Sequence, residues 1–381
     1  MWSLRIRRLL PKAGLLGLAL TISVVLAEVV VRLALPQFYI TGPRGMFVPD
    51  PPRRFRLSPG VHGTLAAVGE FSHSISINSL GMRGPEIGKK SPETYRIVAL
   101  GDSFTFGFGV EIEQTFIALA QDRLRSTVSG NIEIINNGVP AFGLPDEVAW
   151  FEQYSLQLEP DLVIINVCLA NDLFDATEDE ISTEMYKRMQ AEKHWSLGAW
   201  LFRRSHLYRL VSQAAPVRAL LGMPESWPIA RLREMIRMHT DTPSELTLKG
   251  RRANQAALAR LAELAEQHDF RLGAMLIPVE YQLVPERWKR LLNNLGLDPT
   301  AYDPEVPRRF FLNAFAEHDI PVLDLWLRFQ AEMQNGEQLF FRKDPHWTPA
   351  GHRLVADTLS AFIVDENLVE SPKPAIIAST L

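Results

Sequence analysis

The chain has 381 residues, of which 46% are hydrophobic, and a formal net charge of −4 at pH 7. This length and composition accommodate one large α/β domain with appendages and exclude a disordered or fibrous protein. The two signs of charge are interspersed without a basic stripe, which argues against nucleic-acid binding, and the single cysteine, Cys168, excludes an intrachain disulfide and a cysteine zinc cage.

The first predicted element is a membrane-spanning helix over residues 13–35, after a basic, cytoplasmic segment, 1–12. Such a helix would be about 34 Å long, enough to cross a hydrocarbon core about 30 Å thick. Its only charges, Glu28 and Arg32, can pair on one helical face near the outer interface. Because the basic residues precede the helix, we expect a single-pass protein whose remaining residues are periplasmic or extracellular. A cleavable signal peptide ending at residues 25–27 is the alternative.

Residues 36–92 are predicted to form an extended linker with short strands. Proline and glycine are frequent there, and residues 74–77 alternate serine with isoleucine. This pattern predicts a short hairpin or an edge strand. We interpret residues 78–84 as a structural turn.

After the linker, apolar runs alternate with amphipathic segments. The runs predict strands over 95–100, 132–135, 162–167, 272–277 and 322–325. The amphipathic segments predict helices over 113–128, 146–158, 251–267, 307–317 and 349–363. This alternation predicts a parallel, doubly wound sheet whose site residues gather at the carboxyl ends of the strands. The predicted α/β domain comprises residues 93–172 and 250–365, followed by a tail, 366–381.

Residues 173–249 interrupt the alternation. They contain Trp195, Trp200, Trp227 and several arginines at helical spacing, without a strand signal. We predict a helical insertion, for which three interpretations stay open. It could cap the site, serve as a scaffold without substrate contact, or rest on the membrane surface.

A serine follows the first strand of the predicted domain. Gly101-Asp102-Ser103 ends an apolar run and predicts a sharp turn that presents the Ser103 hydroxyl, with Asp102 supporting the turn. Gly107 and Gly109 keep the following loop open to a ligand. A serine hydroxyl is a weak nucleophile, so the site also needs a base, an orienting carboxylate and oxyanion donors.

The candidate base is His346, in a loop before the last predicted helix. Asp344 lies two residues earlier, close enough in an extended loop to orient the imidazole. His352 is the rival base, but it falls within the predicted helix, where we expect a packing role. We therefore predict a catalytic triad of Ser103, His346 and Asp344.

With these motifs the chain resembles the SGNH (GDSL-type) hydrolase superfamily, which comprises serine esterases with a flavodoxin-like three-layer α/β/α sandwich. Residues 101–109 resemble the first motif of that superfamily, Asn171-Asp172 the third, and residues 346–351 the last. The resemblance implies that Ser103 is the nucleophile and that the Asn171 side chain is an oxyanion donor. It also implies that the reaction needs no metal or organic cofactor.

Two positions depart from the superfamily pattern. The oxyanion glycine usually lies five residues after an asparagine such as Asn136, and here that position is Ala141. Because the donor is a backbone N–H, alanine can serve if the loop adopts the same angles, and Gly138 is a nearby alternative. The acid commonly lies three residues before the histidine, where this chain has Lys343, with Asp344 one residue later.

The Asp-Pro-His-Trp sequence at residues 344–347 resembles the Asp-x-His-Trp of SGNH-like sugar acetyltransferases that modify exopolysaccharides, although in those the pair precedes the serine. We expect a serine esterase acting on a short acyl ester of an envelope or extracellular substrate, with acylated glycans among the candidates. An O-acyltransferase that acetylates a polysaccharide is the first alternative. A catalytically idle binding or assembly module on the same fold is the second.

Overall fold

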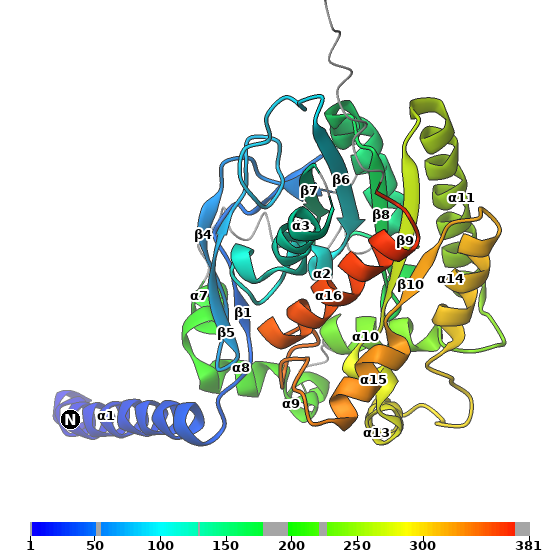
Figure 1. Cartoon of the computed structure of the whole chain (residues 1–381). Helices are drawn as coiled ribbons and strands as arrows, with labels where there is room; N and C mark the ends of the chain where they lie inside the picture. Colours follow the sequence, from blue (N-terminus) through cyan, green and yellow to red (C-terminus); the bar gives the residue numbers. More distant parts are fainter. Residues whose placement is uncertain (1, 51–54, 129, 178–196, 221–226, 370–381) are drawn as a thin grey trace, which may run out of the picture. The chain divides into compact units, whose positions relative to one another are not determined.

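The computed structural model describes residues 2–50, 55–128, 130–177, 197–220 and 227–369 (Figure 1). Its contacts divide the chain into two compact units. The first unit comprises Met1–Tyr39 and Gln190–Pro228, and the second comprises Ile40–Met189 and Ile229–Leu381. The predicted insertion therefore contributes residues to both units, and its residues 178–196 and 221–226 lie outside the described part of the chain.

A five-stranded parallel sheet forms the centre of the second unit. Its strand order is β10-β9-β8-β6-β7, the flavodoxin-like order. The strands are β6 (Thr94–Gly101), β7 (Asn131–Gly138), β8 (Leu162–Cys168), β9 (Arg271–Ile277) and β10 (Val322–Asp324). The structure confirms the predicted fold class and all five predicted strands of this sheet.

Helices cover both faces of this sheet. α3 (Phe116–Thr127) packs against α16 (Pro349–Asp365), and both lie in front of the sheet in Figure 1. α11 (Glu245–His268) packs against α4 (Leu144–Trp150) and α14 (Val306–Ala316). Every residue of β8 is buried, as expected for a strand that is covered on both sides.

The described residues of the second unit also form α2 (Ser103–Phe106), α5 (Asp172–Asp175), α10 (Trp227–Arg237, whose first two residues belong to the first unit), α12 (Glu280–Leu283), α13 (Pro285–Leu295) and α15 (Trp326–Gln334). Of these helices, α2, α12, α13 and α15 were not predicted. The predicted helix over 146–158 is not a continuous α-helix in the structure. After α4 the chain continues as a π turn, Phe151–Ser155. Trp150 and Ser155 lie one π repeat apart, and both donate to Asn137 Oδ1, at 2.9 and 2.7 Å.

The predicted linker contributes short strands to the second unit. They are β1 (Ile40–Thr41), β2 (Phe47–Pro49), β3 (Phe55–Leu57), β4 (His62–Ala67) and β5 (Phe71–Ser76). β4 and β5 form an antiparallel hairpin, which the alternation over residues 74–77 predicted. The Asn78 side chain closes the following turn by accepting hydrogen bonds from the backbone N–H groups of Leu80 and Met82.

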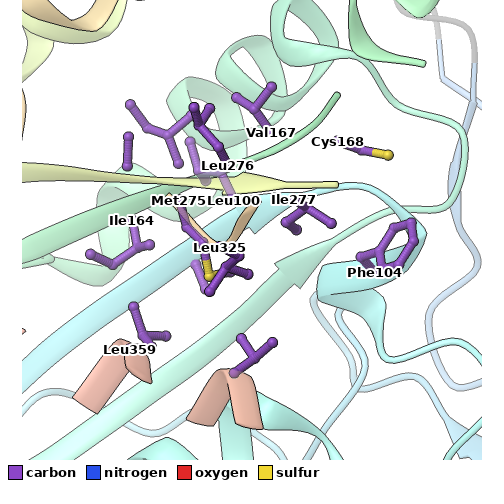
Figure 2. Close-up of a cluster of buried hydrophobic side chains, with 14 of the residues drawn as sticks. Leu100, Phe104, Ile164, Val167, Cys168, Met275, Leu276, Ile277, Leu325 and Leu359 are labelled. Atoms are coloured by element: carbon purple, nitrogen blue, oxygen red, sulfur yellow. The ribbon is translucent and has the colours of Figure 1, made fainter. Parts of the chain in front are cut away.

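The main hydrophobic core lies along the sheet and contains side chains of β8, β9 and α16 (Figure 2). Ile164, Met275 and Leu359 are each no more than 1% exposed. Cys168 also lies in this core, and burial raises the pKa of its thiol well above the ordinary value. The thiol is therefore a packed core side chain.

The first unit contains α1 (Trp2–Ala34), α7 (Leu197–Arg204), α8 (His206–Gln213) and α9 (Ala215–Leu220). Residues Gly14–Ala34 have a mean hydropathy of 2.3 and are long and apolar enough to cross a membrane, which fits an anchor and a signal sequence alike. Arg32 Nε donates to Glu28 Oε1 at 2.8 Å, as the spacing of the two residues predicted. The described residues of the predicted insertion form helices and turns, without a strand.

Three buried histidines make the stability of the second unit sensitive to acid. Burial lowers the pKa of His73 and His239 to about 4 and that of His352 to about 3, from an ordinary value of 6.5. Near pH 5 the unfolded chain therefore binds about one more proton at each histidine, so stability present at neutral pH is lost as the pH falls from about 6.5 toward about 4.

His352→Gln should reduce the slope of the unfolding free energy against pH, by the amount that corresponds to the binding of about one proton on unfolding. The glutamine oxygen can still accept the Phe116 N–H, which His352 Nδ1 accepts at 3.2 Å. Urea unfolding at a series of pH values measures the dependence. An unchanged slope between about pH 6 and pH 4 would show that His352 does not contribute.

Candidate active site

Ser103 lies at the start of α2, close after the carboxyl end of β6. Asp102 caps this short helix, because its Oδ1 accepts the Phe104 N–H at 2.8 Å. Gly101 has a φ of 152°, and a Cβ there would lie 2.1 Å from Thr105 Oγ1. The turn that carries Ser103 therefore requires glycine at position 101.

His346 reaches Ser103 from a loop far along the chain. Its Nε2 lies 2.7 Å from Ser103 Oγ, and its Nδ1 lies 2.5 Å from Asp344 Oδ1. The backbone N–H of His346 donates to the same Asp344 oxygen at 3.0 Å. Phe104 and Phe108 flank the imidazole, with ring centroids 4.8 and 4.6 Å from it. The structure thus brings together the three side chains of the predicted triad.

The Asp344 carboxylate is well suited to orient this imidazole. Burial by itself raises the pKa of Asp344, but the charge of His346 and the two hydrogen bonds from it outweigh burial and lower that pKa. The ionised carboxylate favours the tautomer with a proton on Nδ1, which leaves Nε2 to accept a proton from Ser103. His352, the rival base, is buried in α16 and accepts the Phe116 N–H.

Asn171 follows β8, the strand beside β6 in the sheet. Its Nδ2 donates to Asp102 Oδ2 at 3.2 Å and to Asp175 Oδ2 at 2.6 Å. Asp175 also pairs with Arg231 of α10. Both amide hydrogens of Asn171 are therefore directed at carboxylates, and an oxyanion contact would replace the longer bond, the one to Asp102.

The loop after β7 holds the candidate backbone donors. Ala141 has a φ of 68°, in the left-handed region that usually favours glycine, so alanine adopts the conformation that a glycine would. In the described part of the chain, no acceptor bonds the N–H of Ala141 or of Ser103. Gly138 differs, because its N–H donates to Asn136 Oδ1 at 3.0 Å. The Gly138 N–H is therefore already bonded in this structure, whereas the Ala141 N–H has no acceptor among the described residues.

Gly138 instead allows two backbone segments to approach each other. A Cβ at position 138 would lie 2.2 Å from the Phe106 nitrogen and 2.9 Å from the Asp102 carbonyl oxygen. Gly138→Ala should therefore displace the turn that carries Ser103 and lower the free energy of unfolding by about 1–3 kcal/mol.

Thermal unfolding measures this loss. Gly88→Ala is the matched control, because a Cβ at position 88 would meet nothing within 4 Å. A Gly138→Ala variant as stable as the parent would show that the two segments can separate without cost.

Several carboxyl groups are buried near Asn171. Burial raises the pKa of Asp102, and it raises the pKa of Glu147 and Asp172 well above the ordinary range. Repulsion among the neighbouring carboxyl groups adds to these shifts, whereas the hydrogen bonds from Phe104 and Asn171 lower the pKa of Asp102. Within the described ranges, no group of three or more His, Cys, Asp or Glu residues could hold a metal ion.

Two buried side chains from the predicted linker hold the loop after Ser103. His73 Nε2 accepts the Gly109 N–H at 3.1 Å, and Arg83 donates to the carbonyl oxygens of Phe106 and Gly107. Sequence reasoning missed both residues, because each acts on a loop distant in sequence and neither lies in a recognisable motif.

Residues 238–379 match the family model described as an SGNH hydrolase-like domain of the acetyltransferase AlgX. The matched segment contains Asp344 and His346. The C-terminal part of the chain is therefore similar to an SGNH hydrolase-like domain. The match begins after Ser103, Ala141 and Asn171, so those three positions lie outside it.

The chain is also similar to solved structures. A putative lipolytic protein of the G-D-S-L family from Desulfitobacterium hafniense DCB-2 is 17% identical, with 70% of this chain and 98% of that chain covered and a TM-score of 0.36. A lipase/acylhydrolase from Enterococcus faecalis is 16% identical, with 74% and 100% covered and a TM-score of 0.37. A two-domain esterase active on acetylated mannans is 16% identical, with 74% and 52% covered and a TM-score of 0.39. A search of curated proteins found no match.

Proposed function

We propose that this protein is a membrane-anchored serine esterase of the SGNH type that cleaves a short acyl ester of an envelope or extracellular substrate. One observation carries the proposal. Ser103 Oγ, the His346 ring and the Asp344 carboxylate form a continuous hydrogen-bonded series, with distances of 2.7 and 2.5 Å. This arrangement gives a serine nucleophile an adjacent general base and an orienting acid, which activate the hydroxyl for attack.

In the proposed reaction, Ser103 Oγ attacks the ester carbonyl carbon while His346 Nε2 accepts the hydroxyl proton. Asp344 stabilises the imidazolium that forms. His346 then donates the proton to the leaving alcohol oxygen, and the ester C–O bond breaks to leave an acyl group on Ser103. Water loses a proton to His346, attacks the acyl carbonyl, and releases the carboxylic acid with the Ser103 hydroxyl restored.

The proposed oxyanion donors are the backbone N–H groups of Ser103 and Ala141 and the side chain of Asn171. Two observations support them. Neither backbone N–H has an acceptor in the described ranges, and the 3.2 Å bond from Asn171 to Asp102 is long enough to be exchanged for a shorter one. Such donors stabilise the charge that develops on the carbonyl oxygen.

Asn171→Ala should lower kcat by about 10²- to 10³-fold with a smaller effect on KM, because the donor contributes mainly when the oxyanion forms. Hydrolysis of p-nitrophenyl acetate measures both constants. Asn335→Ala, at the exposed end of α15, is the matched control. An unchanged kcat in a variant that unfolds at the parent temperature would exclude Asn171 as a donor.

A second candidate function is O-acyl transfer to a glycan. It is favoured by the match of residues 238–379, with Asp344 and His346, to a family model described as an acetyltransferase. In this reaction a sugar hydroxyl replaces water and takes the acyl group from Ser103.

One incubation distinguishes these functions. The full chain in detergent receives p-nitrophenyl acetate together with an unacetylated polysaccharide, and both free acetate and glycan-bound acetate are measured. Free acetate alone supports the esterase, whereas glycan-bound acetate supports the transferase. If neither product forms and no other short acyl ester is cleaved, the chain is the idle module of the same fold.

A further inference from the structure

Three helices of the first unit present apolar side chains to solvent. On α7, α8 and α9 the exposed large hydrophobic residues are Leu197, Trp200, Phe202, Tyr208, Val211 and Leu220. The segment 197–220 also contains four arginines and no carboxylate. An exposed apolar surface next to charge of a single sign indicates an interaction surface.

The end of α1 is bound tightly to these helices. The Glu28 carboxylate caps α8, because it accepts hydrogen bonds from the Ser205 hydroxyl at 2.7 Å and from the backbone N–H groups of His206 and Leu207 at 3.0 and 2.9 Å. Arg32, the partner of Glu28, donates to the Arg204 carbonyl oxygen. The start of α8 is therefore fixed beside the last two turns of α1.

The chain that leaves α1 adds two contacts. The Gln37 N–H donates to His206 Nδ1 at 2.9 Å. The Arg209 guanidinium lies over the Tyr39 ring, 3.7 Å from its centroid. α8 is thus bonded both to residues before the end of α1 and to residues after it. It cannot move far from the end of α1 without breaking these bonds.

These contacts set the depth of α7 and α8 relative to a membrane. Residues 14–27 of α1 carry no charge, and Glu28 is the first charged residue after them. From Lys12 to Glu28 the helix rises about 24 Å, a few ångströms less than the core, and the long Lys12 side chain can extend to the inner headgroups, so Glu28 lies near the outer boundary of the core if α1 spans it. The start of α8, which is bonded to Glu28, and the adjoining end of α7 lie at that level.

We propose that α7, α8 and α9 rest on the outer leaflet of the membrane that α1 spans, and that the ligand of this surface is anionic phospholipid. The apolar side chains enter the boundary between acyl chains and headgroups, where Trp200 and Tyr208 are residue types favoured at interfaces. Arg204 and Arg218 contact lipid phosphates. Continuity with α1 and the uniformly positive charge favour lipid over a second copy of the chain.

The test uses the full chain in vesicles of equimolar phosphatidylcholine and phosphatidylglycerol that contain headgroup-nitroxide lipid. A fluorophore is attached at Val211→Cys, since Val211 is 46% exposed and the native Cys168 is buried. Val30→Cys on α1 is the positive control. The same Val211 label in vesicles without nitroxide lipid is the matched control.

We expect the nitroxide lipid to quench the label at Val211 nearly as much as the label at Val30. Fluorescence at Val211 that is the same with and without nitroxide lipid would overturn the proposal. A Val211 label that is shielded equally in lipid-free detergent and cross-links to a second chain would also overturn it, because protein would then cover the surface.

The charge component is tested separately with Arg204→Gln and Arg218→Gln. Each arginine near an anionic surface changes the partition constant by about fivefold. Both variants should therefore reduce quenching at Val211 in vesicles with phosphatidylglycerol but not in vesicles of phosphatidylcholine alone. Equal quenching of parent and variants in both vesicle types would overturn the assignment of anionic lipid, and thermal unfolding confirms that the variants are folded.

Discussion

Replacement of Ser103 by alanine is expected to lower kcat for short acyl esters by about 10⁴- to 10⁶-fold. Without the hydroxyl oxygen no acyl-enzyme can form, and His346 has only water to activate. A fluorophosphonate probe, which bonds to activated serines, should label the parent and not the variant. Hydrolysis of p-nitrophenyl acetate and probe labelling measure the two effects independently.

The matched control is Ser126→Ala. Ser126 is exposed on α3, where its hydroxyl donates to the Arg123 carbonyl oxygen. This variant should hydrolyse ester and accept the probe like the parent. If Ser103→Ala kept its activity and its labelling, the nucleophile would have to be another residue and the proposed esterase mechanism would fail.

Asp344→Asn is expected to lower kcat by about 10³- to 10⁴-fold. The asparagine oxygen can still accept the backbone N–H of His346, so the loop should stay folded. The amide has no negative charge to stabilise the imidazolium, and its NH₂ group favours the tautomer of His346 that cannot accept the Ser103 proton. Steady-state kinetics measure the loss, and thermal unfolding shows whether the variant is folded.

Lys343→Ala is the control for this prediction. Lys343 is the exposed neighbour that occupies the usual position of the acid, three residues before His346. Its replacement should leave kcat within about twofold of the parent, because surface substitutions rarely disturb a buried site. Equal losses in both variants would point to a disturbed loop, and full activity of Asp344→Asn would require a different acid.

The sheet and the meeting of its strand ends could be predicted from sequence. Each central strand is a short run of β-branched and aliphatic residues, such as 162–167, and such runs fit a strand that is buried on both faces. Because parallel strands end at one edge, Ser103 after β6 and Asn171 after β8 were expected to lie close together. The structure confirms the strands. The two strand ends lie close together, because Asp102, the residue before Ser103, accepts a hydrogen bond from the Asn171 side chain.

Other features depend on contacts that no local pattern encodes. α13 and α15 have apolar residues, Val284 and Leu325, at the N-cap position, so neither start shows the usual capping side chain there. The pairing of Asp175 with Arg231 joins residues 56 positions apart and depends on where α10 packs. The direction of the Asn171 amide depends in turn on Asp175, and for that reason sequence alone could not show that its hydrogens are directed at carboxylates.

The bond between Ser103 and His346 joins residues 243 positions apart. At a synthesis rate of about 5–20 residues per second, about 10–50 seconds separate the addition of these two residues to a growing chain. Throughout that interval the serine has no base. Ester turnover can therefore begin only after the loop that carries His346 and the last helix, α16, have docked. The time at which turnover begins measures when the chain has completed folding.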